Sequence, residues 1–151
     1  MLYPLQGEVL NFAVEDTKTF LMDYYISRTV SAQMGWDAIR QKVEAALAEQ
    51  GFGVLTEIDI RATMKKKLDK EYLPHVILGA CNPVFADRAL QSDPHISTML
   101  PCNVTLRQTE SGDIEVAAID PAAAMGMIGD PHIAALADEV RDRLATVINN
   151  I

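Results

Sequence analysis

The stretch MLPCNVTLRQTESGDIEVAAI, residues 99–119, decides the fold. Apolar and polar side chains alternate over residues 99–108 and again over 114–119, which is the pattern of a β-strand with one buried face. The five residues between them, 109–113, include Gly112, and a short loop of this kind joins neighbouring strands in a hairpin. We therefore expect the two strands to pair antiparallel in one sheet.

Three further strands are expected upstream. Residues 23–30 and 53–61 alternate in the same way, whereas residues 74–81 are nearly all apolar, as in a strand covered on both faces. Within 53–61 the alternation places the side chains of Val54, Thr56, Ile58 and Ile60 on one face and those of Leu55, Glu57, Asp59 and Arg61 on the other.

Helical periodicity indicates two long amphipathic helices. One begins near Trp36 and stops at Gly51, and the other opens at Asp130-Pro131, a capping residue followed by proline. A short helix runs from Asn82-Pro83 to about Leu90. The order strand, helix, strand, strand, short helix, strand, strand, helix predicts an α+β fold, a mainly antiparallel five-stranded sheet with its two long helices on one face.

The length of 151 residues suits a single domain, and 49% hydrophobic with 23% charged residues is typical of a globular chain. Residues 1–21 show no sustained period, so we expect a leader or N-terminal arm before a single α+β domain over 22–151. No apolar stretch approaches the roughly 20 residues of a membrane span. A net charge of −8 argues against nucleic acid as a partner. Two cysteines within apolar runs favour free thiols in a reducing compartment, and we expect a cytoplasmic protein.

Four short motifs carry a resemblance to a known family. They are residues 51–59 (GFGVLTEID), 77–83 (ILGACNP), 100–104 (LPCNV) and 120–121 (DP). As a set they resemble family 302 of domains of unknown function, a widespread bacterial and archaeal family, from about Tyr24 to the end of the chain. The resemblance implies an α+β fold like one half of the TATA-box-binding protein and assembly as a homodimer. It implies no established reaction.

Two cysteine–asparagine pairs form the first candidate site. Cys81-Asn82 closes one expected strand and Cys102-Asn103 lies near the start of the next, so antiparallel pairing brings both thiols to the same end of the sheet. Thiolates bind zinc and copper(I), and a thiol beside a helix N-terminus has a lowered pKa. One interpretation is a soft-metal or redox site. The other is two structural free cysteines, because zinc usually needs three or four protein ligands and no Cys-x-x-Cys pair occurs.

Glu57 and Asp59 form the second candidate site, since residues two apart on a strand share a face. Paired carboxylates serve as acid and base or bind a hard cation, and Lys65, Lys67 or Tyr72 would approach from the following loop. The alternative is a solvated sheet face with a salt bridge to Arg61 or a lysine. Likewise, the lysines of 65–67 suit either an anion site or a solvated turn.

No serine–histidine–acid set or phosphate-binding loop is present in the sequence. The leading hypothesis is therefore a small dimeric ligand-binding or interaction module. Its cleft is expected between the least apolar sheet face and the loops near Cys81 and Cys102. The second hypothesis is a thiol- or metal-dependent enzyme or sensor that uses these two cysteines, and a soft metal there is the only cofactor we consider.

Overall fold

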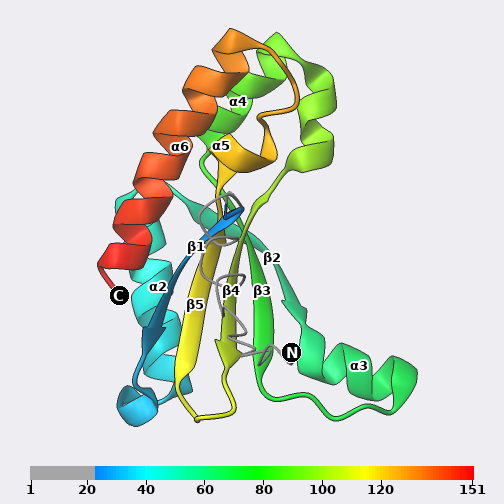
Figure 1. Cartoon of the computed structure of the whole chain (residues 1–151), viewed down its shortest axis with the longest axis vertical. Helices are drawn as coiled ribbons and strands as arrows, with labels where there is room; N and C mark the ends of the chain where they lie inside the picture. The colour runs from blue at the N-terminus through cyan, green and yellow to red at the C-terminus, as the bar shows by residue number, and fades with distance from the viewer. Residues whose placement is uncertain (1–22) are drawn as a thin grey trace, which may run out of the picture.

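The computed structural model describes residues 23–151, and five strands within them form one sheet (Figure 1). Every neighbouring pair is antiparallel, in the spatial order β1-β5-β4-β3-β2, which confirms the expected sheet. The strands are β1 Tyr25–Val30, β2 Gly53–Asp59, β3 His75–Cys81, β4 Cys102–Gln108 and β5 Ile114–Ile119. The expected leader or arm over residues 1–21 lies outside the described residues.

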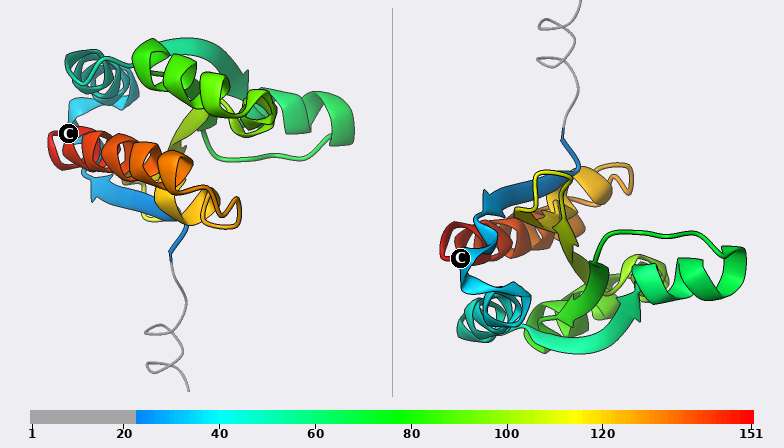
Figure 2. Two further views of the ribbon diagram at one scale, coloured as in Figure 1. Left: turned by 90° about the horizontal axis from the view of Figure 1, so that it is seen from above. Right: turned by 90° about the horizontal axis from the view of Figure 1, so that it is seen from below.

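Helices α2 and α6 cover one face of the sheet, α4 and α5 form a cap beyond its end with the start of α6, and α3 projects to the side (Figures 1 and 2). They are α2 Trp36–Glu49, α3 Ile60–Leu68, α4 Pro83–Ser92, α5 Pro121–Ala124 and α6 Pro131–Asn149, with 3₁₀ turns η1 Ala32–Met34 and η2 Pro94–Met99. None of the helices within residues 23–151 is both long and apolar enough to cross a membrane.

The main core lies between one face of the sheet and the helices α2 and α6, which confirms that both long helices share a face. Alternate strand residues enter it, so Leu78, Val104 and Val116 are fully buried in three adjacent strands. Val43 and Leu144 meet them from the two helices. Burial of these side chains supplies most of the driving force for folding, at roughly 25 cal/mol per Å² of apolar surface.

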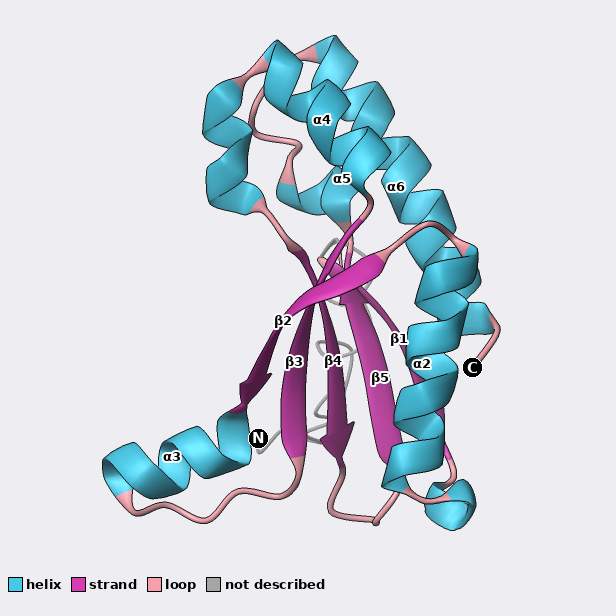
Figure 3. Ribbon diagram, turned by 180° about the vertical axis from the view of Figure 1, so that it is seen from behind, coloured by secondary structure: helices cyan, strands magenta, loops and turns pink. Residues whose placement is uncertain are grey.

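A second, smaller core lies beyond the ends of β3 and β4, where α4, η2 and the first turns of α6 pack together (Figure 3). Phe85, Ile96, Ile133 and Leu136 are its large buried side chains. The start of α6 is fixed as expected, because the Asp130 carboxylate accepts hydrogen bonds from the backbone N–H of His132, at 2.8 Å, and of Ile133.

Strand β3 departs from its expected environment. Val76, Leu78 and Ala80 are buried, but His75, Ile77 and Cys81 are only half-buried, so the strand is not covered equally on both faces. The outer face of the sheet has no layer of helices from residues 23–151 over it (Figures 2 and 3). Apolar residues on that face lie beside residues of the neighbouring strand instead. Ile77 of β3, for example, pairs with Ile58 of β2.

Strand β2 is shorter than expected, and the side chains of Thr56, Glu57 and Ile58 point to the opposite faces of the sheet from those expected. It ends at Asp59, and the chain turns at once into α3, so the lysines of 65–67 lie on a helix and not in a turn. A register shift between Val54 and Thr56 then separates two residues expected on the same face. As a result Thr56 and Ile58 lie on the outer face, and Glu57 pairs with Leu78 on the helix-covered face.

Candidate functional site

The structure brings the two cysteines to one cavity. Cys102 begins β4 opposite Ala80, and Cys81 is the next residue of β3, so both lie at the end of the sheet that meets the helical cap. Both residues line a cavity closed by α4, α5 and α6, together with Met125 and Phe85. Both cysteines are free thiols, and Cys102 is the more deeply buried.

This thiol cavity is small and almost wholly apolar. It offers about 40 Å³ to the centre of a water molecule, and about 10–15 Å³ of such space holds one water. Apart from the two thiols, Asn82 is the one lining residue with a polar side chain, and its Nδ2 donates to the Gln50 carbonyl at 3.2 Å. The cavity therefore suits an ion or a very small molecule and not a drug-sized ligand.

The thiols in this cavity are protonated at neutral pH. Burial raises the pKa of Cys81, and burial followed by the nearby Cys81 raises the pKa of Cys102 to about 11. The expectation of a lowered thiol pKa at the start of α4 is therefore wrong, because the cost of burying a thiolate outweighs the helix N-terminus.

The outer face of the sheet holds a second and larger hollow. It offers about 400 Å³ to the centre of a water molecule, within the range of about 300–1,000 Å³ typical of ligand sites. Its floor comes from alternate residues of three strands, and Tyr24 and Tyr25 form its rim with their rings edge to face, 5.1 Å apart. The polar side chains that line this sheet hollow are those of His75, Asn103, Thr105, Arg107 and Glu115, besides the two tyrosines.

Charges in the sheet hollow are partly paired. Arg107 Nε donates to Glu115 Oε1 at 2.9 Å, and about half of the Arg107 side chain stays exposed to solvent. Partial burial, followed by the positive charge of Arg107, lowers the pKa of His75, so its imidazole is neutral at pH 7. The hollow thus presents a guanidinium, a neutral imidazole and the Asn103 amide side by side with two phenol rings.

The expected single cleft is in fact two separate features. Cys102 and Asn103 are consecutive in a strand and point to opposite faces of the sheet. Cys102, Cys81 and Asn82 therefore line the thiol cavity, while Asn103 lines the sheet hollow. Both cysteines lie at the same end of the sheet, as expected, but Cys102 pairs with Ala80, so the side chain of Cys81, the next residue, lies on the opposite face.

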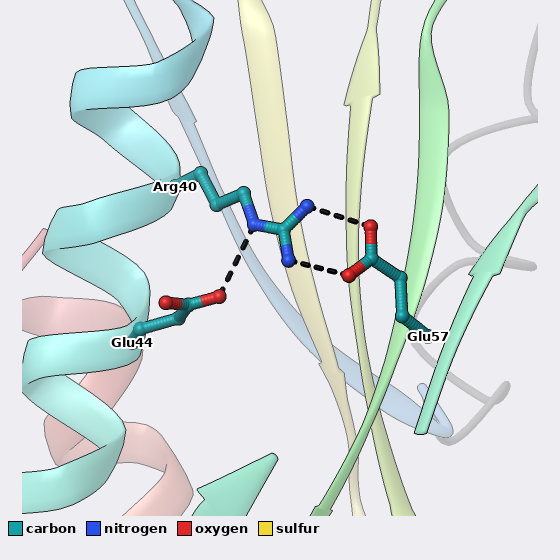
Figure 4. Close-up of polar contacts among 3 residues, drawn as sticks. All are labelled: Arg40, Glu44 and Glu57. Atoms are coloured by element: carbon teal, nitrogen blue, oxygen red, sulfur yellow. Dashed lines mark hydrogen bonds and ion pairs between the residues drawn. The ribbon is translucent and has the colours of Figure 1, made fainter. Parts of the chain in front are cut away.

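Glu57 and Asp59 do not act as a pair. Both oxygens of the Glu57 carboxylate accept from the Arg40 guanidinium of α2, at 2.6 and 2.5 Å, and Arg40 Nε also donates to Glu44 (Figure 4). Asp59 caps α3 by accepting from the Ala62 N–H at 2.9 Å. The salt-bridge partner of Glu57 is therefore Arg40, and not Arg61 or a lysine as expected.

The remaining candidates lie on α3 or in the loop after it, and none of them lines the thiol cavity or the sheet hollow. Lys65 Nζ bonds Asp69 at 2.6 Å and Glu71 at 2.8 Å, and the pKa of Lys65 is raised by these two partners. Lys67 is exposed on the same helix. Tyr72 is exposed in the loop that follows. None of the three approaches Glu57 as expected, because the chain forms α3 where a loop was expected.

Except for Asn103, the polar residues of the sheet hollow were missed by sequence reasoning. His75, Arg107 and Glu115 come from three strands that are far apart in the sequence. The signal that could have identified them is the alternation of side chains along a strand. Each directly adjoins a buried core residue such as Val76 or Leu106, and so points to the opposite, outer face. Within residues 23–151 no group of three or more histidine, cysteine or acidic side chains is placed to hold a metal ion.

Comparison with known proteins gives a consistent result. The family model described as "Domain of unknown function DUF302" matches residues 26–151. Among solved structures, the chain is similar to an uncharacterized conserved DUF302 protein from Bacillus stearothermophilus, with a TM-score of 0.78 and 27% sequence identity over 85% of this chain and 98% of that one. A comparison with the curated proteins finds no match.

Proposed function

The chain belongs to the DUF302 family, and from that premise we propose that it is a small homodimeric binding module whose ligand site is the sheet hollow. The observation that carries this proposal is the combination of size and chemistry on one rigid surface. About 400 Å³ of space is lined by donors, an acceptor and aromatic rings that strands hold in place.

The lining indicates the class of ligand. Arg107 donates to Glu115 through Nε, so its other N–H groups can donate to an anionic group of a ligand. A hydrogen bond to a charged group contributes about 1.5–3 kcal/mol. Tyr24 and Tyr25 offer ring surface beside it. A small molecule that joins a flat ring to a carboxylate, sulfonate or phosphate group satisfies both parts of the hollow.

The test uses 8-anilino-1-naphthalenesulfonate, a dye that combines aromatic rings with a sulfonate. We expect saturable fluorescence enhancement, and an Arg107→Gln variant with at least about tenfold weaker affinity, the loss of one charged hydrogen bond. Lys42→Gln removes an exposed positive charge on α2 and serves as the matched control, with unchanged affinity. Equal affinity for the dye in the native chain and in Arg107→Gln would contradict the proposal.

The homodimer proposal rests on a projecting segment, residues 60–73, which we call the basic arm. It comprises α3 and the loop after it, and extends away from the body of the domain (Figures 1 and 2). None of the residues of α3 is buried. A helix of nine residues is too short to be stable alone in water, so a further packing surface is expected against it.

Charge and exposed apolar surface both favour a second copy of the chain as the partner that packs against the basic arm. Residues 60–73 carry five basic side chains and two acidic ones, a net charge of +3 in a chain of net charge −8, which leaves −11 on the remaining residues. The basic arm of one copy is thus complementary to the acidic body of another. Leu68 and Leu73 on the arm and Leu55 on the adjacent edge strand are among the most exposed large apolar side chains.

Sedimentation equilibrium of the full chain tests this interface. We expect a dimer that Leu68→Glu converts to a monomer with an unchanged circular dichroism spectrum. Val84→Glu places the same charge at an exposed apolar position of α4 and should leave the dimer intact. A native chain that sediments as a monomer at all concentrations overturns the dimer and leaves the sheet-hollow proposal to its own dye test.

We also propose a reducing compartment such as the cytoplasm. The support is that Cys81 and Cys102 are both free, although they lie at the same end of the sheet. Cell fractionation with an antibody against the chain is the direct check, and recovery of the chain from an oxidising compartment would contradict this proposal.

A further inference from the structure

The two ends of the sheet hollow differ in chemistry. Tyr24 and Tyr25 place two phenol rings at one end, and Arg107 lies at the other end beside Glu115. The strand register fixes their separation, because Tyr25 pairs with Ile119 and Arg107 pairs with Glu115, four residues earlier on β5. At roughly 3.3 Å per residue, the two ends lie about 13 Å apart along the sheet.

Short side chains form the floor between these ends. Thr105 of β4 pairs with Ala117 of β5 midway between them, and both residues line the hollow. Asn103 adds an amide group to the same floor. A ligand can therefore lie along the strands, and it reaches both ends only if a chain of several atoms separates its ring from its charged group.

The charged end of the hollow suits a single negative charge. Arg107 donates to Glu115 through Nε, and its terminal N–H groups can donate in parallel to both oxygens of a carboxylate. The pKa of His75 is lowered, first by burial and then by Arg107, so its neutral imidazole adds no positive charge at pH 7. Among residues 23–151, Arg107 is thus the one cation that lines the hollow, and Glu115 repels a second negative charge on a ligand.

We propose that the sheet hollow binds an aryl-alkanoate, a monocarboxylate whose aromatic ring is separated from the carboxylate by a chain of several atoms. The carboxylate lies on Arg107, the chain lies over Thr105 and Ala117, and the ring packs on the two tyrosines. This inference rests on the proposed function of the hollow and narrows the class of its ligand. An acid attached directly to a ring falls short of one end, and a phosphate ester brings a second negative charge toward Glu115.

Calorimetric titration of the full chain tests the contact at each end, with 6-phenylhexanoate as the ligand and 6-phenylhexanol as its uncharged analogue of equal length. We expect the acid to bind at least about tenfold more tightly than the alcohol, the contribution of one charged hydrogen bond. Arg107→Gln should remove this difference, and Lys42→Gln should keep it. Tyr25→Leu should weaken both ligands about two- to tenfold, whereas Tyr72→Leu, at an exposed tyrosine outside the hollow, should weaken neither.

Phenylacetate tests the span of the ligand. With its carboxylate on Arg107, its ring does not reach the tyrosines, so Tyr25→Leu should leave the affinity for phenylacetate unchanged. An equal loss of affinity for phenylacetate and for 6-phenylhexanoate in Tyr25→Leu would contradict the proposed span.

The charge of the ligand is tested with 6-phenylhexyl phosphate, which carries close to two negative charges at neutral pH. It should bind the native chain more weakly than 6-phenylhexanoate does. Glu115→Gln keeps an acceptor for Arg107 Nε but removes a negative charge, so it should strengthen binding of the phosphate more than binding of the acid. Glu49→Gln removes an exposed negative charge on α2 and should change neither affinity.

A measurement on the native chain alone guards against a variant that fails to fold. In bound 6-phenylhexanoate, the phenyl protons should show intermolecular nuclear Overhauser effects to the Tyr25 ring, and the methylene next to the carboxylate should show them to Arg107. The inference is overturned if these contacts are absent, or if the acid and the alcohol bind equally. Either result, together with dye binding that depends on Arg107, removes this ligand class and leaves the hollow as a ligand site. Dye binding that Arg107→Gln leaves unchanged overturns the proposed function, and the inference falls with it.

Discussion

Glu57→Gln separates a structural role of this carboxylate from a role in ligand binding. The substitution keeps the shape of the side chain but removes its charge from the Arg40 guanidinium, which it contacts through both oxygens at 2.6 and 2.5 Å. Exposed ion pairs contribute roughly 0.2–1 kcal/mol, and this one is bidentate, with side chains 28% and 43% exposed. We therefore expect a loss of about 1 kcal/mol in the free energy of unfolding at pH 7.

The pH dependence of that loss has a definite sign. The hydrogen bonds from Arg40 lower the pKa of Glu57 in the folded state. The stabilisation is therefore present above the unfolded-state pKa of about 4.3 and is lost as the pH falls through the folded-state value. The native chain and the Gln variant should differ at pH 7 and converge in acid, below the folded-state pKa.

Urea unfolding followed by circular dichroism at the two pH values measures both effects. Glu49→Gln is the control, because Glu49 is exposed on α2 without an ion pair in the described part of the chain. Dye affinity should not change in either variant, since Glu57 lies on the helix-covered face. A loss that persists unchanged in acid, or a weakened affinity for the dye, would refute the structural role.

Three further substitutions test the local structure. Asp59→Ala removes the cap of α3 and should speed amide exchange in residues 60–68 with a cost of about 1 kcal/mol, while Asp59→Asn keeps the cap; equal exchange in both would count against it. Gly51→Ala should lower the melting temperature, because φ is +83° and the new Cβ would lie 2.9 Å from Asn82 Nδ2; an unchanged Tm would disprove this conflict. Leu78→Ala, at a fully buried position in the central sheet, should cost about 2–5 kcal/mol in urea unfolding; a cost below 1 kcal/mol would place Leu78 outside the core.

The parts of the fold that sequence predicted were those with a local chemical cause. Gly51 ends α2 because its backbone adopts a positive φ, and Asp130-Pro131 starts α6 because a carboxylate accepts the free N–H groups there. The hairpin around Gly112 likewise needs only its own residues. Each of these signals lies within a few residues of the feature that it determines.

The parts that sequence missed depend on contacts between distant segments. The arm helix α3 has no buried residue, so Ile60–Leu68 lacks the apolar stripe by which a helix is recognised. The register shift in β2 is a property of its pairing with β3, and it moved Glu57 to the face where α2 supplies Arg40. The sheet hollow joins residues forty positions apart, such as His75 and Glu115, so no single segment reveals it.

Two-dimensional NMR of the ¹⁵N-labelled chain tests the central claim, that ligands bind on the outer face of the sheet. With added 8-anilino-1-naphthalenesulfonate, we predict the largest shifts at the backbone amides of Asn103, Thr105 and Ala117, which line the hollow. Shifts confined to α2 and α6, with these three amides unmoved, would contradict the claim.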